Sequence, residues 1–236
     1  MDHDGAERGI PFRLIVPRVA LARVGSVQLS VGATMIYPVD VTVEYGNGER
    51  SRGLAVAGIL APIKMLLALP HFFVLALVQF GAFIAGYFGF WVIAFTGKLS
   101  PGIARFVHNS LGWNVRITAW FGSLRDEYPA FALEQPEYQA RVVITEPTLE
   151  RSRGLAVAGI IWFLKGLLLI PHVIVLYFVG IAAAIAGYIA YWVIAITGVY
   201  PDGIFNFVVG ALRWSTRTSA WLLSLTDEYP PFALRA

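Results

Sequence analysis

Two lysines stand alone inside long apolar stretches of this chain. Lys64 is the only formal charge between Gly53 and Gly97, and Lys165 is the only one between Gly154 and Gly198. A charge near the middle of a membrane costs about 2.5 to 3.5 kcal/mol on insertion scales, so each lysine is a functional candidate. Each also lies shortly before a proline, where its aliphatic stem can extend to the far interface. We favour this snorkelling placement, with a polar pathway as the alternative.

Two histidines directly follow those prolines, at His71 and His172. An imidazole at this position can cap backbone groups at a helix break or lie at the membrane interface, which is the interpretation that we favour. It can also titrate near neutral pH. The alternative hypothesis is that the lysines and histidines line a two-fold related polar path.

Paired carboxylates followed by Tyr-Pro close two segments of the chain. Such pairs can serve acid–base chemistry or bind a divalent ion, but they are also common partners of arginine. We favour ion pairs, because an arginine lies ten residues before each pair. The residues concerned are Asp126 and Glu127 with Arg116, and Asp227 and Glu228 with Arg217.

Other chemistry finds no support in the sequence. There is no cysteine, and the four histidines show no metal-ligand spacing, so we expect no metal and no cofactor. Neither a phosphate-binding loop nor a nucleophile elbow is present. We therefore expect a protein that is not an enzyme.

The chain contains a tandem repeat with an offset of 101 residues. Residues 49–59 recur identically at 150–160, and Trp120 matches Trp221 without a gap between. We divide the chain into an N-terminal extension (1–36), a first repeat (37–133) and a second repeat (134–236).

The composition indicates an integral membrane protein. Hydrophobic residues make up 57% of the chain and charged residues 14%, whereas about a quarter of the residues are charged in soluble domains. The formal charge of +3 suits a surface that faces anionic lipid. Because basic residues normally flank apolar spans, we infer no nucleic-acid partner.

Alternating patterns predict short strands. Short runs occur in the extension, from Phe12 to Val31, and the clearest runs cover Val39 to Tyr45 and Tyr138 to Thr145. Open sheet edges are not stable in hydrocarbon, so these strands should form a small extramembrane sheet. Gly46 to Gly48 predicts a turn after the first strand of this sheet.

Each repeat then carries two apolar segments separated by the proline. In the first repeat they cover residues 53–69 and 71–96, and basic residues flank both ends of each pair. If positive flanks remain inside, each pair enters the membrane and returns. We expect two parallel hairpins that turn at Pro-His, four apolar helices and cytoplasmic termini. The alternatives are an interfacial first segment, or a wedge that does not fully cross.

An amphipathic segment follows each apolar pair, at residues 103–124 and 204–225. Trp113 and Trp120 lie on its apolar side and Arg116 lies near its polar side, a composition typical of a helix in the headgroup plane. Packing of the apolar stripe on the sheet is the alternative.

Several motifs resemble those of a known family. They are Leu-Pro-His and Ile-Pro-His at 69–71 and 170–172, Trp-Val-Ile-Ala before Thr-Gly, Arg-Trp-Ser-Thr-Arg at 213–217, and the closing Asp-Glu-Tyr-Pro. With them the chain resembles the uncharacterised "domain of unknown function 4389" family of bacterial, mainly actinobacterial, membrane proteins. The resemblance covers residues 37–133 and 138–234 and implies a cell-envelope membrane protein. It supplies no catalytic residues, and Ala130 departs from the second proline of the closing motif.

The fold class that we expect is a mainly α membrane protein with two tandem repeats. Each repeat has a transmembrane helical hairpin and an interfacial amphipathic helix, with a small extramembrane β-region. We expect a multi-pass protein of the bacterial cytoplasmic (inner) membrane that acts as a non-enzymatic scaffold or accessory subunit. Its partners would be the lipid bilayer and either its own copies or other membrane proteins. A small oligomeric channel or transporter and a lipid-binding protein are the alternatives.

Overall fold

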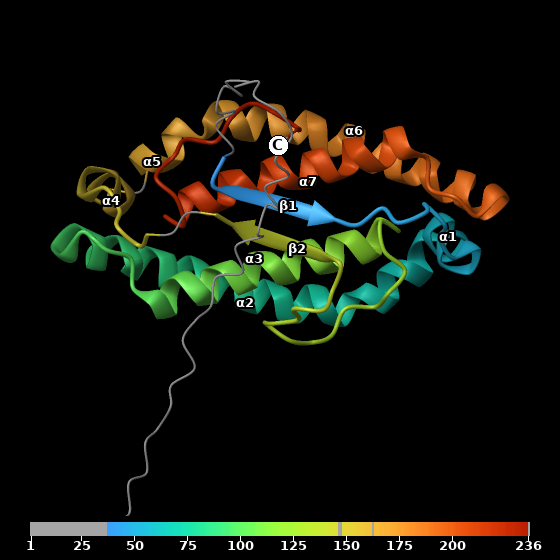
Figure 1. The fold of residues 1–236 in the computed structure, drawn as a ribbon, viewed down its shortest axis with the longest axis horizontal. Coiled ribbons are helices and arrows are strands. Elements are labelled where there is room, and N and C mark those ends of the chain that lie inside the picture. Colours follow the sequence, from blue (N-terminus) through green and yellow to red (C-terminus); the bar gives the residue numbers. More distant parts are fainter. Residues whose placement is uncertain (1–36, 146–147, 162, 236) are drawn as a thin grey trace, which may run out of the picture. The chain divides into compact units, whose positions relative to one another are not determined.

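The computed structural model describes residues 37–145, 148–161 and 163–235. Within them the protein is mainly helical, with seven helices and one two-stranded sheet (Figure 1). The strands predicted between residues 12 and 31 lie outside the described residues.

The predicted small sheet is confirmed. β1 (Val39–Val43) pairs antiparallel with β2 (Ala140–Ile144), and Val41 lies opposite Val142. The alternation places Val39 and Val41 in the core, while Thr42 is exposed. Both strands are shorter than predicted. The turn after the first strand is also present, with Gly46 and Gly48 at φ values of +63° and +79°, which glycine adopts readily.

The apolar part of the first repeat forms a short helix and a long one. α1 (Arg52–Ile59) begins at the N-cap Ser51, whose hydroxyl accepts a hydrogen bond from the Leu54 N–H at 3.3 Å. α2 (Ala61–Thr96) has a proline in its first turn, where the missing N–H has no helical partner to lose. It ends at Gly97, whose φ of +76° suits the left-handed cap.

The prediction of a hairpin at Pro-His is wrong. Pro70 lies inside α2, and the helix continues through it for another 26 residues. In the second repeat, α4 (Arg153–Ile160) and α5 (Phe163–Leu168) precede α6 (Ile170–Thr197). Here the proline occupies the first turn of α6, and the Val173 N–H donates to the Leu169 carbonyl at 2.9 Å, so the chain does not reverse. Both repeats have a break earlier, at Leu60 and Ile161, and the second repeat has a further one at Leu169, just before its proline.

The reversal occurs instead after each long helix. α3 (Pro101–Phe121) returns along α2 and packs on β2, and α7 (Asp202–Leu222) returns along α6 and packs on β1 (Figure 1). Trp113 and Trp120 are 4% and 2% exposed because they pack into a cluster with Ala68 and Leu75 of α2. The predicted placement of this tryptophan stripe among lipid headgroups is therefore wrong. It packs on its own long helix, while the sheet covers another side of α3.

Each short helix packs on the long helix of the other repeat. α1 packs on α6, and α4 packs on α2. Gly58 of α1 lies against the Tyr191 ring, and Gly159 of α4 lies against the Phe90 ring. The two repeats therefore share one core instead of stacking two finished units.

Among the residues that the structure describes, two helical segments are long and apolar enough to cross a membrane, judged by length and composition. They are Ile63–Thr96 in α2 and Ile170–Thr197 in α6, with mean hydropathy values of 2.0 and 2.4. Only 22% and 11% of their most apolar windows are buried inside the protein. This low burial distinguishes them from the core helices of a water-soluble domain.

The contact between Gly58 and Tyr191 gives a first prediction. A Cβ atom at position 58 would lie 2.7 Å from the ring, so Gly58→Ala forces the ring to move. We expect the free energy of unfolding in detergent to fall by about 1 to 3 kcal/mol, the usual cost of overpacking. Chemical denaturation followed by tryptophan fluorescence measures it.

Gly53→Ala in the same helix is the matched control. Its Cβ would meet nothing closer than the Ser51 hydroxyl at 3.8 Å, and alanine is the better helix former. This variant should be as stable as the parent or slightly more stable. Equal losses at both positions would show that α1 does not depend on a close approach to α6.

Candidate functional site

The two intramembrane lysine candidates are buried in aromatic cages. Lys64 is 1% exposed and donates a hydrogen bond to the Ser123 hydroxyl at 2.6 Å. Its ammonium lies 5.3 Å from the Trp120 ring and 4.8 Å from the Tyr191 ring, where the ring faces attract a cation. The predicted snorkelling of Lys64 to an interface is therefore wrong.

The second cage repeats the first with partners exchanged. Lys165 is 0% exposed, donates to the Ser224 hydroxyl at 2.9 Å and lies over Trp221 and Phe90, at 4.7 and 5.0 Å. The last ring of each cage comes from the other repeat. Snorkelling is wrong for Lys165 as well, because the cages use both ammonium groups to join the repeats.

The serines of the cages lie in unusual turns. Ser123 and Ser224 have φ values of +52° and +58°, in the left-handed region that residues with a Cβ atom seldom adopt. A buried arginine holds each turn: the Nε atom of Arg50 donates to the Ser123 and Leu124 carbonyls, and the Nε atom of Arg151 donates to the Ser224 carbonyl. Burial lowers the pKa of Arg50. Because the pKa of a free arginine lies far above neutrality, the guanidinium remains charged.

Sequence reasoning missed these two arginines. The signal that could have found them is the identical run at 49–59 and 150–160, because Arg50 and Arg151 are its second residues. An arginine next to apolar residues was interpreted only as a topological flank. In the structure Arg50 and Arg151 are 9% and 7% exposed, and they bind backbone carbonyls.

The two histidines are enclosed by aromatic rings and do not cap the backbone. The Nδ1 atom of His71 accepts a hydrogen bond from the Trp113 indole at 3.0 Å, and its ring stacks on Phe131 at 3.7 Å. His172 has the same arrangement with Trp214 and Phe232, at 2.9 and 3.8 Å. Both are 0% exposed, so neither imidazole is open to the surroundings of the protein.

The tyrosine of each closing motif completes the ring of aromatic side chains around the histidine. Tyr128 contacts the His71 ring edge-on, and its hydroxyl donates to the Leu67 carbonyl at 2.9 Å. Pro70 lacks the N–H that would bond the Leu66 carbonyl, and the Tyr128 hydroxyl bonds the carbonyl of the next residue, Leu67. Tyr229 donates to the Leu168 carbonyl in the same way, at 2.6 Å. The closing motif thus folds over the Pro-His segment.

The structure does not bring the lysines and histidines together as a path. Lys64 and His71 lie on the same buried stripe of α2, but Ala68, which is 0% exposed, lies between them. Each polar group is enclosed by its own rings, and the edge-on contact of Trp120 with Tyr128 joins the two enclosures. These residues act as packing and hydrogen-bonding groups.

The predicted ion pairs of Arg116 and Arg217 with the carboxylates of the closing motifs are wrong. Arg116 donates to the Ala132 and Leu133 carbonyls, at 2.6 and 3.1 Å. The Asp126 and Asp227 carboxylates instead accept hydrogen bonds from the backbone N–H groups of Ser51 and Ser152. Each carboxylate therefore secures the start of α1 or α4, where a helix N-terminus favours negative charge.

The glutamates of the pairs contribute through their backbone. The Glu127 carbonyl accepts a hydrogen bond from the Tyr138 hydroxyl at 2.7 Å, and the Glu228 carbonyl accepts one from the Tyr37 hydroxyl at 2.9 Å. Both tyrosines are buried, and burial raises the pKa of Tyr138. A tyrosine at the start of one repeat thereby ties down the end of the other.

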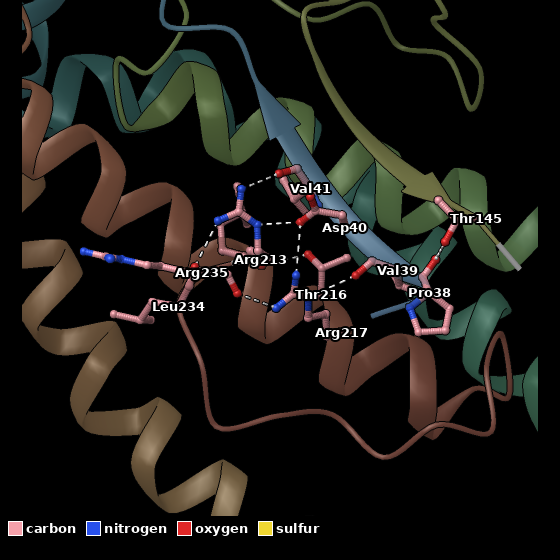
Figure 2. Close-up of polar contacts among 11 residues, drawn as sticks. Pro38, Val39, Asp40, Val41, Thr145, Arg213, Thr216, Arg217, Leu234 and Arg235 are labelled. Carbon is pink, nitrogen blue, oxygen red and sulfur yellow. Dashed lines mark hydrogen bonds and ion pairs between the residues drawn. The ribbon is translucent and has the colours of Figure 1, made fainter. Parts of the chain in front are cut away.

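Arg217 belongs to a different cluster, on the outer edge of β1 (Figure 2). The Asp40 carboxylate receives the Nε atom of Arg213 and, at 3.3 Å, the NH2 atom of Arg217. The same arginines donate to the carbonyls of Val41 and Val39, at 3.1 and 3.0 Å. Burial lowers the pKa of Arg217 and the nearby Asp40 charge opposes this, so the guanidinium stays charged. Two arginines of α7 therefore provide hydrogen-bond donors for the carbonyl groups at this edge of the sheet.

The positions related to this cluster by the 101-residue repeat do not form a second one. The residue that corresponds to Asp40 is Arg141, which is exposed, and the residue that corresponds to Arg213 is Gly112. On that side the edge carbonyl of Val142 is bonded by the His108 Nε2 atom, at 3.1 Å. The sheet is thus closed on both edges by different chemistry.

The described part of the surface has hollows near both the sheet and the long helices. One, of about 360 Å³, lies between the turn after β1 and the first closing motif, and Arg50, Arg125 and Asp126 line it. Another, of about 400 Å³, is a groove between α6 and α7, with Val173, Tyr177 and Ser219 in its walls. Among the residues that the structure describes, no three His, Asp or Glu side chains are placed to hold a metal ion.

These features define a class of protein: a mainly helical tandem repeat in which two long apolar helices are exposed and each repeat completes the core of the other. The sequence model described as "Domain of unknown function (DUF4389)" matches residues 61–132 and 161–233, more than half of the chain. The protein therefore belongs to this family, which confirms the resemblance and the tandem repeat. No curated protein and no solved structure matches the chain.

The lysine cages give a second prediction. Ser123→Ala leaves the buried Lys64 ammonium without its acceptor, which should cost about 1 to 3 kcal/mol of unfolding free energy. In a Lys64→Met background the same change should cost clearly less, because no ammonium is left without an acceptor. We expect a coupling energy of about 1 kcal/mol or more in this double-mutant cycle.

The cycle also removes the effect of backbone strain at position 123, since Ser123→Ala occurs in both backgrounds. Lys98→Met is the control for loss of a lysine, because the Lys98 side chain is 66% exposed in its pair with Glu150. Its effect should stay below about 0.5 kcal/mol. Additive losses for the two cage variants would contradict a direct bond between lysine and serine.

The Asp40 cluster gives a third prediction. Asp40→Asn removes the charge that faces Arg213 and the 1% exposed Arg217, so we expect a loss of about 1.5 to 3 kcal/mol in unfolding free energy. Glu150→Gln, in an exposed pair whose side chains are 66% and 71% accessible, should change it by less than about 0.5 kcal/mol. A similarly small change for Asp40→Asn would show that this cluster does not hold the sheet edge.

Proposed function

We propose that this protein is an integral membrane protein that acts as a non-enzymatic scaffold or accessory subunit for other membrane components. The observation that carries the proposal is the exposed apolar surface of the two long helices. Phe73 and Phe95 of α2 are 69% and 76% exposed, and Phe178 and Ile196 of α6 are 66% and 74% exposed. Apolar patches of this extent are costly in water and mark a contact with lipid or with another protein.

The polar residues support a holding role. Lys64, His71 and Arg217, which were candidates for chemistry, are bonded to groups of the same chain. Buried charges and imidazoles that have internal partners fix the relative positions of packed elements. A rigid frame with a polar sheet on one side and apolar helices on the other suits a protein that presents a surface at a membrane.

We place the protein in the cytoplasmic membrane of a bacterium. α2 and α6 each exceed the roughly 20 residues that a span requires, which is the length that the multi-pass arrangement predicted from the sequence needs. The orientation of these helices, across the bilayer or parallel to it, is a separate question, which the surroundings of α2 address below.

Lipid binding is the second candidate, and the groove between α6 and α7 favours it. Leu169, Val173 and Leu176 form an apolar wall, while Ser215 and Ser219 offer hydroxyl groups along the opposite helix. An acyl chain with a polar head group suits this mixture. A small oligomeric channel or transporter is the third candidate, and flux into liposomes distinguishes it.

Cross-linking in native membranes, followed by affinity purification, tests the scaffold function. The expected result is the same membrane protein partner in repeated preparations, lost when the exposed sheet residue Thr42 and its neighbours are blocked by a bulky label. Purification of the protein alone, together with ion or solute flux in liposomes, would contradict the scaffold and support a channel.

The membrane assignment gives a fourth prediction. The protein should remain in the membrane pellet after an alkaline carbonate wash, and Phe73→Asp combined with Phe178→Asp should lower the retained fraction. A carboxylate in hydrocarbon costs about 2.5 to 3.5 kcal/mol, so two of them weaken insertion severely. The control is Thr42→Asp on the exposed sheet, which should leave retention unchanged. Release of the unaltered protein by carbonate would contradict the assignment.

A further inference from the structure

The exposed apolar surface runs along the whole length of both long helices. On α2 one stripe of large side chains is between 61% and 76% exposed from one end to the other, at Leu66, Phe73, Phe80, Phe88 and Phe95. On α6 a similar stripe is between 44% and 74% exposed, at Ile174, Ile181, Ile185, Trp192 and Ile196. These spacings of four, seven and eight residues keep each stripe on one face of its helix.

α3 and the sheet, which form the polar side of the molecule, lie alongside α2. α3 returns antiparallel to α2, since a Cβ at Gly89 would meet Leu99, Gly81 faces Phe106, and Trp113 reaches back to His71. β2 in turn lies on α3, with His108 bonded to the Val142 carbonyl. α2, its returning partner α3 and the short strand β2 therefore lie side by side in this order (Figure 1).

Charged groups consequently lie beside the middle of α2. Asn109, near the level of the middle turns of α2, donates to the exposed Glu134 carboxylate at 2.8 Å. Arg141 and Thr42 face solvent on the sheet. If α2 stood along the membrane normal, these groups would lie at hydrocarbon depth, where each charge costs about 2.5 to 3.5 kcal/mol.

The lengths of the helices also argue against α2 and α6 crossing the membrane. The apolar part of α2 has 34 residues and that of α6 has 28, which correspond to about 51 Å and about 42 Å of helix. To fit a hydrocarbon core of about 30 Å they would need tilts of about 54° and about 44°, beyond the range of roughly 0 to 40° seen for spanning helices.

We propose that the protein lies in a single leaflet, with α2 and α6 parallel to the bilayer plane and the sheet and closing motifs facing water. This inference rests on the proposed membrane function and defines the lipid-binding surface. The exposed arginines at the starts of α1 and α4 fit this placement, because they lie at the ends of the long helices. Arg52 donates to the Thr197 carbonyl at 3.2 Å, and Arg153 lies against Gly97. Both can reach headgroup phosphates in the same plane.

Depth measurements with spin labels test this placement. The chain has no cysteine, so single cysteines can replace Leu66, Phe73, Phe80, Phe88 and Phe95 in turn. Each variant carries a nitroxide in phosphatidylcholine and phosphatidylglycerol vesicles, and collisions with oxygen and with a water-soluble nickel complex report its depth. Since the five sites cover about 43 Å of helix, a single-leaflet helix gives depths that agree within about 5 Å. A crossing helix gives a profile that rises to a maximum near Phe80 and falls again.

Matched labels complete the design. Cysteines at Thr42 and Glu134 should be reached by the nickel complex and not by lipid-dissolved oxygen, and the α6 stripe should repeat the depths of the α2 stripe. A peaked profile in vesicle-bound protein would overturn the single-leaflet placement alone. Strong coupling between stripe labels of two copies, without contact with lipid, would overturn it in favour of self-association. Failure to float with vesicles would overturn the membrane function itself.

Discussion

The mutual completion of the two repeats is the constraint on which this structure depends. Neither repeat closes its own core: α1 packs on the long helix of the second repeat, and α4 packs on the long helix of the first. The lysine cages follow the same rule, because Tyr191 covers Lys64 and Phe90 covers Lys165. An ammonium group is tolerated in each apolar interior only because serine and aromatic partners surround it.

The same constraint explains why the closing motifs recur almost unchanged. Asp126 and Asp227 each bond the N-cap residue of a short helix, and the tyrosines after them each donate to a helix carbonyl three residues before a proline. The short helix reaches across to the other repeat, so these contacts position the junction between the copies. The Asp-Glu pairs resemble catalytic carboxylates, but here they fix the position of each short helix on the long helix of the other repeat.

The sequence allowed the repeat, the two strands and the exposed apolar helices to be predicted, since each rests on a local period. It did not show whether the chain turns back at Pro-His in each repeat. Pro70 was interpreted as a turn, yet α2 continues through it, and the Tyr128 hydroxyl donates to the Leu67 carbonyl in the adjoining helical turn. That donor lies 58 residues away in the chain, where no local pattern reveals it. The partners of Lys64, Arg50 and Arg217 were missed for the same reason: each is set by tertiary contacts.

The sheet edge shows what covalent joining of the copies has permitted. Asp40 gathers two arginines on one edge, while the equivalent residue on the other edge is Arg141, and Gly112 stands where an arginine would be needed. A dimer of identical single-repeat chains would have to carry the same side chain at both positions, so it would have two acidic edges or two basic ones. Linkage in one polypeptide lifts that symmetry requirement and gives the molecule two chemically distinct flanks, and thereby a direction.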